Sequence, residues 1–240
     1  MESTTYDESL TSILEQVHTG RIQVPEFQRA WRWDDALIRG LVASVSLGYP
    51  IGALTLLEAG SSDTRFDSQP IAGAPTSTAP PQRFLIDGLQ RLTALYQVFM
   101  SPRTVQTVDD GTAPAHRRYY VDVAAAVDPQ MDRDHAILSV PAAGHAEQLG
   151  RCFPLGLALG DHAAQQDWLH GFASRRADDG PAQTSDLVAR FEAHVLRHIE
   201  SYALPVIHLD RGTTRWTVRV HGGPDGPVRS DRYRVPAPEQ

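Results

Sequence analysis

Residues 84–96, FLIDGLQRLTALY, place an acidic and a basic side chain around a glycine, where an apolar run changes into a helix-like pattern. A helix that starts directly after a strand leaves backbone N–H groups free and presents the positive end of its dipole, which attracts anions. Gly88 has no Cβ and lets a phosphate approach, and Arg91 can reach the same anion with two hydrogen bonds. Asp87 can hold Mg²⁺ or orient a water, because a phosphate site needs its charge offset.

The same spacing has a purely structural interpretation. Asp87 can cap the N-terminus of the helix and pair with Arg91 four residues later, as aspartates at helix starts commonly do. The pattern Asp-Gly-x-x-Arg is not specific by itself, so spacing alone leaves both interpretations open.

A second group of polar and aromatic side chains lies in residues 24–33, VPEFQRAWRW. Pro25 fixes an extended backbone, after which Gln28 and Arg29 stand among three aromatic side chains. This mixture suits a nucleotide, because phosphates favour arginine and a base favours an aromatic face or an amide. The alternative is an aromatic cluster that packs the next helix onto the sheet and leaves the arginines in water.

The remaining metal-ligand side chains form no complete site in the sequence. His194 and His198 are spaced so that a helix can point both imidazoles at one metal ion, but no third ligand is evident. Cys152 is the only cysteine, which excludes an internal disulfide and a multi-cysteine metal site. We expect it to be a small buried apolar residue.

The composition excludes several classes of function. All 22 basic side chains are arginine, so a Walker-type phosphate loop and Schiff-base chemistry, which both need lysine, are excluded. The net charge of −7 argues against a broad electrostatic grip on nucleic acid, so any DNA contact would be local. No apolar run approaches the roughly 18 residues that span a bilayer, and the N-terminus has no export pattern. We therefore expect a cytoplasmic protein with no membrane partner.

Apolar periodicity predicts the helices and strands that must position these motifs. The predicted helices cover 7–18, from Asp34 or Asp35 to Gly48, 88–100 and 186–202, and the predicted strands cover 22–24, 51–58, 83–87, 119–123, 137–140 and 204–209. This order indicates an α/β or α+β fold in one main domain, since 240 residues can bury a sizeable core. Residues 59–82 have few large apolar side chains and are predicted to be a mobile insertion, and 210–240 an atypical, disordered tail.

The N-terminal half of the chain resembles the N-terminal domain of GmrSD-type restriction endonucleases, a group with a ParB/sulfiredoxin-like fold that also occurs in the defence protein SspE. Four segments carry the resemblance in order: VPEFQRAWRW, SLGYPIGALTLLE, FLIDGLQRLTALY and YALPVIHL. The resemblance is close over residues 10–100 and loose over 117–209. It implies a ParB/sulfiredoxin-like mixed sheet, flanked by helices, over residues 7–209.

The resemblance also implies nucleotide binding and hydrolysis, coupled to restriction of modified phage DNA. The residues that match the family's two motifs are Gln28, Arg29, Asp87, Gly88, Gln90 and Arg91. The implied cofactors are Mg²⁺, held through Asp87, and a nucleoside triphosphate, either GTP, ATP or CTP. Leu89 departs from the family's Asp-Gly-Gln-Gln-Arg signature, and the loss of one amide is expected to alter affinity or hydrolysis more than the fold.

After LPVIHL the chain departs from the family pattern. Full-length members add an HNH-type nuclease domain, and residues 211–240 contain no nuclease motif. The expected function is therefore a Mg²⁺-dependent nucleoside triphosphatase that serves as the sensor of an antiphage restriction system, not a nuclease by itself. Its expected partners are the nucleotide, modified DNA and a separately encoded nuclease subunit. Two alternatives stay open: a non-hydrolysing DNA- or partner-binding module, and a truncated, inactive remnant.

Overall fold

The computed structural model describes residues 3–27, 33–60, 67–78, 80–101, 104–107, 115–142, 150–176 and 180–210. In chain order the elements are β1 (Ser3–Ser9), α1 (Leu10–His18), β2 (Ile22–Pro25), α2 (Asp35–Ser46), β3 (Leu54–Glu58), β4 (Ser68–Gln69), β5 (Arg83–Asp87), α3 (Leu89–Phe99), β6 (Val105–Thr107), β7 (Ala115–Asp122), η1 (Ala125–Val127), α4 (Arg133–Ala136), β8 (Ile137–Pro141), β9 (Cys152–Pro154), η3 (Leu155–Leu157), α5 (His162–Arg175), α6 (Pro181–Phe191), the π-helix η5 (Glu192–Leu196), α7 (Arg197–Glu200) and β10 (Ala203–Leu209). This content confirms an α+β fold, while the ParB/sulfiredoxin-like topology stays a prediction. No helix in the described ranges is long and apolar enough to cross a membrane.

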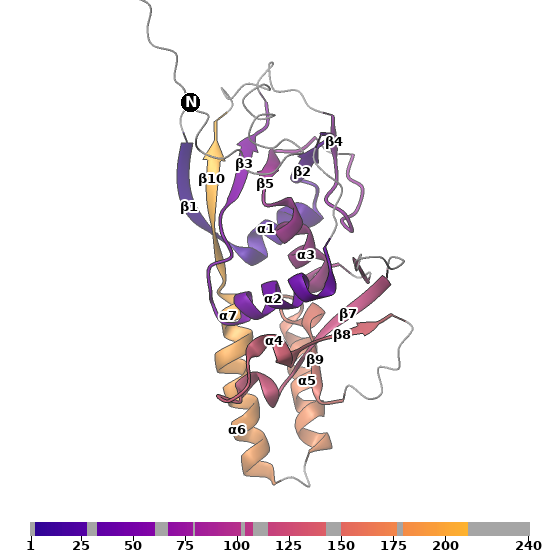
Figure 1. The fold of residues 1–240 in the computed structure, drawn as a ribbon, viewed down its shortest axis with the longest axis vertical. Coiled ribbons are helices and arrows are strands. Elements are labelled where there is room, and N and C mark those ends of the chain that lie inside the picture. Colours follow the sequence, from indigo (N-terminus) through magenta and orange to yellow (C-terminus); the bar gives the residue numbers. More distant parts are fainter. Residues whose placement is uncertain are drawn as a thin grey trace, which may run out of the picture.

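The larger of two sheets has six strands in the order β1-β10-β3-β5-β2-β4 (Figure 1). The pairs β10–β3 and β2–β5 are parallel, and the pairs β1–β10, β3–β5 and β2–β4 are antiparallel. The sheet is therefore mixed, and it brings the first and last described strands together.

The first predicted helix begins three residues later than expected, because the chain before it is a strand. Residues Ser3–Ser9 pair with β10 along the edge of the sheet, and all but one of them are exposed. Ser9 then caps α1, since its side chain accepts a hydrogen bond from the Ser12 backbone N–H. A polar edge strand shows no apolar alternation, so periodicity could not reveal β1.

The main hydrophobic core begins between one face of this sheet and helices α1, α2 and α3, and it continues through β7 and β9 to α5 and α6. Its members from α1 recur at helical spacing: Leu10, Ile13, Leu14 and Val17. A smaller cluster of Leu57, Phe84 and Ile86 packs on the opposite side of β3 and β5. Strand β5 is thus buried on both faces up to Ile86, which accounts for its continuous apolar run.

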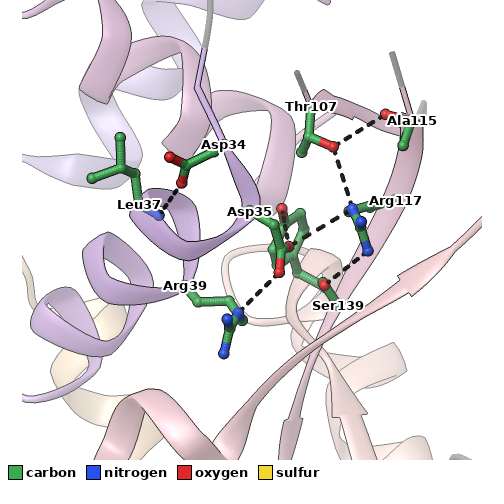
Figure 2. A network of polar contacts seen from close by, with 9 residues as sticks. Asp34, Asp35, Leu37, Arg39, Thr107, Ala115, Arg117 and Ser139 are labelled. Atoms are coloured by element: carbon green, nitrogen blue, oxygen red, sulfur yellow. Dashed lines mark hydrogen bonds and ion pairs between the residues drawn. The ribbon is translucent and has the colours of Figure 1, made fainter. Parts of the chain in front are cut away.

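The smaller sheet is built from β6, β7 and β8 in that order, with β9 also paired to β7. Helices α5 and α6 lie side by side at the end of the molecule away from the larger sheet (Figure 1). The start of α2 contacts the smaller sheet: Asp34 caps the helix at Leu37, while Asp35 approaches Arg117 of β7 and binds Arg39 (Figure 2). Asp34 is therefore the capping residue of the predicted pair.

Several predicted boundaries differ from the structure. The helix predicted over 186–202 begins at Pro181, runs through the π-helix and ends at Glu200, and α5 was not predicted at all. Within the predicted insertion, β4 pairs with β2 and Ile71 is buried in the core, so this part of the segment packs against the sheet. The predicted tail beyond residue 210 lies outside the described residues.

Candidate functional site

The junction between β5 and α3 is a sharp turn that only glycine fits. Gly88 has a left-handed backbone with φ of 94° and is the N-cap of α3. A Cβ at this position would lie 2.4 Å from the Leu54 Cδ2 atom on the neighbouring strand. A buried strand can therefore pass directly into a helix whose first turn sits against β3.

Asp87 points its carboxylate into solvent at this junction. Its side chain is 69% exposed, and one oxygen lies 3.8 Å from Nη2 of Arg91. The N-cap residue is Gly88, and α3 has no side-chain capping hydrogen bond. Of the two contacts that the structural interpretation predicts, the Asp87–Arg91 pair is present and the cap by Asp87 is not, because the N-cap residue is a glycine.

Arg91 binds the turn that precedes β3. Its Nη1 donates to the backbone oxygen of Ile51 at 2.5 Å, and its Nη2 donates to that of Ala53 at 2.9 Å. Gly52, between them, has φ of 87°, and a Cβ there would lie 2.5 Å from Nη1. The guanidinium thus joins the SLGYPIG and DGLQR segments, and its side chain is 23% exposed.

Tyr202 holds the same turn from the opposite end of the chain. It is buried, and its hydroxyl donates to the backbone oxygen of Tyr49 at 2.6 Å. Burial raises the pKa of Tyr202, while a hydrogen bond from the Ile51 backbone and the charge of Arg91 oppose that rise. We call residues 49–53 the Gly-Pro turn from here on; two side chains fix it by hydrogen bonds to three of its carbonyls.

The other predicted site residues have different positions. Gln90 is half-buried in the first turn of α3. Leu89 is half-buried and packs against the main core. The leucine that replaces the family's first glutamine therefore makes an apolar contact. Gln28 and Arg29 lie outside the described residues. Sequence reasoning assigned no role to Tyr202 or to Gly52, although the two glycines around Tyr-Pro-Ile indicated a constrained turn.

The two histidines considered as metal ligands do not converge on a metal site. Nδ1 of His198 lies 3.2 Å from the backbone oxygen of Ser46, at the C-terminus of α2. Arg133 donates to the same oxygen at 3.1 Å, so the side chains of His198 and Arg133 both bind the last carbonyl of α2. His194 is exposed. Cys152 is buried, as expected, and burial raises the pKa of its thiol.

A second polar cluster joins β1, β5 and β10 of the larger sheet and contains Glu8, Arg83 and His208. Arg83 donates to both carboxylate oxygens of Glu8, at 2.5 and 2.9 Å, and reaches Gln16 at 2.5 Å. Nε2 of His208 lies 3.0 Å from Glu8, and the ring of Tyr6 stacks on the imidazole. Desolvation raises the pKa of Glu8, but Arg83 outweighs it and the net pKa is lowered; burial lowers the pKa of His208.

A small cavity of about 140 Å³ lies at the other end of α3, between that helix and β7. Gln97 lines it and is buried, with its amide nitrogen bound to the backbone oxygen of Ala72. The cavity lies at the C-terminal half of α3, and Asp87 precedes the N-terminus, so the cavity belongs to a different part of the molecule.

Comparison with known proteins places these features in a family. Residues 10–168 match the family described as "GmrSD restriction endonuclease, N-terminal domain". The uncharacterized protein MJ0686 of Methanocaldococcus jannaschii is 27% identical over 144 residues, which are 58% of this chain and 24% of that protein. The chain therefore spans about a quarter of this relative. The family match includes the β5–α3 junction and the Gly-Pro turn but ends before Tyr202.

Proposed function

The chain belongs to the family of GmrSD restriction endonuclease N-terminal domains, and on that premise we propose that it binds a nucleoside triphosphate with Mg²⁺ at the start of α3. In this proposal the domain senses nucleotide state within a restriction system. GTP, ATP and CTP are the candidate nucleotides.

The observation that carries the proposal is the arrangement at the β5–α3 junction. An uncapped helix start, a glycine without Cβ and a solvent-exposed carboxylate lie within one turn of chain. Backbone N–H groups and the helix dipole favour a phosphate there. Mg²⁺ typically takes one or two carboxylates together with substrate phosphates, so a single exposed Asp87 fits the chemistry of a nucleotide-bound metal.

The roles of the residues follow from their contacts. Gly88 and the N–H groups after it would hold a phosphate, and Asp87 would hold Mg²⁺ or orient the attacking water. Arg91 has two of its five N–H donors on the Gly-Pro turn, so in this proposal it adds positive charge near the phosphates while it fixes the turn. Gln28, Arg29 and Gln90 would complete the pocket.

The partners follow from the family rather than from the site. A restriction-system domain is expected to work with DNA and with a nuclease, and we propose modified DNA and a separately encoded nuclease subunit as those partners. The ParB/sulfiredoxin-like topology is part of the same proposal.

Calorimetry with GTP, ATP and CTP, each with and without Mg²⁺, tests the proposed function. We expect micromolar to millimolar binding of one nucleotide that strengthens with Mg²⁺ in the wild type and loses its Mg²⁺ dependence in Asp87→Asn. Arg91→Ala is less informative, because it also releases the Gly-Pro turn. Absence of binding by the folded wild type would overturn the proposal. Duplex binding without nucleotide that weakens as salt rises would instead support a DNA-binding module.

A further inference from the structure

We propose that Tyr202 is a positioning residue for the nucleotide site. Its side chain fixes the Gly-Pro turn, and the turn fixes the guanidinium of Arg91 beside the start of α3. The inference rests on the proposed nucleotide site at α3. It goes beyond that site because Tyr202 lies after the part of the chain that matches the family, at the junction of α7 and β10.

The contacts form a continuous chain from Tyr202 to the β5–α3 junction. The Tyr202 hydroxyl donates to the backbone oxygen of Tyr49 at 2.6 Å, two residues before Ile51 on the same turn. The oxygen of Ile51 in turn accepts from Arg91 at 2.5 Å. The short turn from Tyr49 to Ile51 therefore connects the buried phenol to the guanidinium.

Two further contacts hold the turn: the N–H of Tyr49 donates to the backbone oxygen of Ser44 at 2.9 Å, and Ile51 packs against the main core. Residues 49–53 are in neither helix nor strand, and two of them are Pro50 and Gly52, of which proline has no N–H to donate. The backbone oxygen of Tyr202 also accepts from the N–H of Leu10 at 2.8 Å, so its own backbone is anchored at the start of α1. A rigid phenol thus holds a turn that regular secondary structure does not hold.

The consequence for binding is geometric. Arg91 lies 3.8 Å from Asp87, so a shift of the guanidinium changes the charge next to the carboxylate that would bind Mg²⁺. Loss of the Tyr202 hydroxyl removes its hydrogen bond to the Tyr49 oxygen without removing any group that touches phosphate. We expect it to weaken nucleotide binding while leaving the binding groups in place.

Tyr202→Phe tests the inference, with Tyr96→Phe as the matched control. Tyr96 is also buried, burial also raises its pKa, and its hydroxyl bonds His18 rather than the turn. The measurements are the Kd of the bound nucleotide with Mg²⁺, the Kd of inorganic tripolyphosphate, and stability by urea denaturation. Gly52→Ala is a second variant, because its Cβ would meet Arg91 from the other side.

We expect Tyr202→Phe to raise both Kd values about five- to tenfold, because the turn loses the free energy of roughly one hydrogen bond. We expect Tyr96→Phe to change neither Kd. An equal stability loss in both variants with a Kd change in only one separates positioning from a general structural role. Unchanged Kd values in folded Tyr202→Phe and Gly52→Ala, with wild-type binding intact, would overturn this inference alone. A wild type that binds no nucleotide overturns the proposed function, and this inference falls with it.

Discussion

Two arginine–carboxylate pairs in this molecule use the same groups in opposite ways. Arg83 is buried and Glu8 is mostly buried, with side chains 10% and 14% exposed, and the two meet through two hydrogen bonds. Arg91 and Asp87 are 3.8 Å apart, and Asp87 is 69% exposed. The first pair joins β5 to the edge strand β1, and the second stands at the uncapped start of α3.

The difference lies in what else each arginine binds. Arg83 donates to the side chains of Glu8 and Gln16, and both members of the Arg83–Glu8 pair have little exposed surface. Arg91 donates two hydrogen bonds to the backbone of the Gly-Pro turn instead of to Asp87, so the Asp87 carboxylate stays exposed to solvent. A buried pair stabilises a fold only while both partners are present, whereas an exposed pair contributes little and is available for a ligand.

Glu8→Ala should produce the largest loss of stability. It leaves the Arg83 guanidinium buried beside His208 with its main partner gone, and breaking a buried pair in this way typically costs about 3–5 kcal/mol. Urea denaturation measures the change. Asp87→Ala is the matched control and should change the free energy of unfolding by less than about 0.5 kcal/mol. Equal losses in the two variants would remove the distinction between the pairs.

Acidification should weaken the same buried cluster. The pKa values of Glu8 and of His208 are both lowered in the folded chain, from their ordinary values of 4.5 and 6.5. A lowered pKa means that the unfolded chain binds the proton more readily, so stability is full at neutral pH. It should fall as the pH drops below about 6.5 and again below about 4.5. Urea midpoints measured from pH 8 to pH 4 test this, and in Glu8→Gln the lower step should be smaller. A flat profile in the wild type would contradict it.

Gly52→Ala should cost more than Gly48→Ala. Both glycines have positive φ, 87° and 73°, so alanine carries backbone strain of about 1–2 kcal/mol at either position. At Gly48 a Cβ meets nothing within 4 Å, and at Gly52 it meets Arg91 at 2.5 Å. The added loss of the Arg91–Ile51 hydrogen bond should bring about 1 kcal/mol more. Equal midpoints in urea would show that Arg91 does not depend on the turn.

The sequence predicted the apolar elements well and the polar ones poorly. Strand β5 and helix α3 were expected because continuous burial and helical periodicity leave a clear pattern. Strand β1 was missed because an edge strand made of polar residues is held by backbone pairing with β10, which no local pattern encodes. Helix α5 was missed because only three of its residues are buried.

The same contrast holds for the candidate site. The motif at 87–91 was recognised from its spacing and family resemblance. The partners of Arg91 are backbone oxygens some 40 residues earlier in the chain, and Tyr202 lies far beyond both. A carbonyl carries no side-chain signature, so sequence reasoning gave Arg91 either a phosphate or Asp87 as its partner and assigned it no role at the turn.

Tyr119→Phe should lower stability by less than the destabilising variants above. It removes a hydrogen bond to Asp35, the carboxylate that joins α2 to β7. The Tyr119 hydroxyl donates to Asp35 at 2.9 Å, and Arg39 donates to the other oxygen at 3.0 Å. Because Arg39 and Arg117 still neutralise Asp35, the loss should be about 1 kcal/mol in urea denaturation. A loss of stability as large as that of Glu8→Ala would show that the Tyr119–Asp35 contact is as important to the fold as the buried Arg83–Glu8 pair.

The most direct measurement is the Mg²⁺ dependence of nucleotide affinity in wild type and Asp87→Asn, two chains that should have nearly equal stability. The proposed function predicts that Mg²⁺ strengthens binding in the wild type and has little effect on Asp87→Asn, because only the wild type has the exposed carboxylate beside the helix start. Equal Mg²⁺ effects in both folded chains, or no nucleotide binding by the wild type, would contradict it.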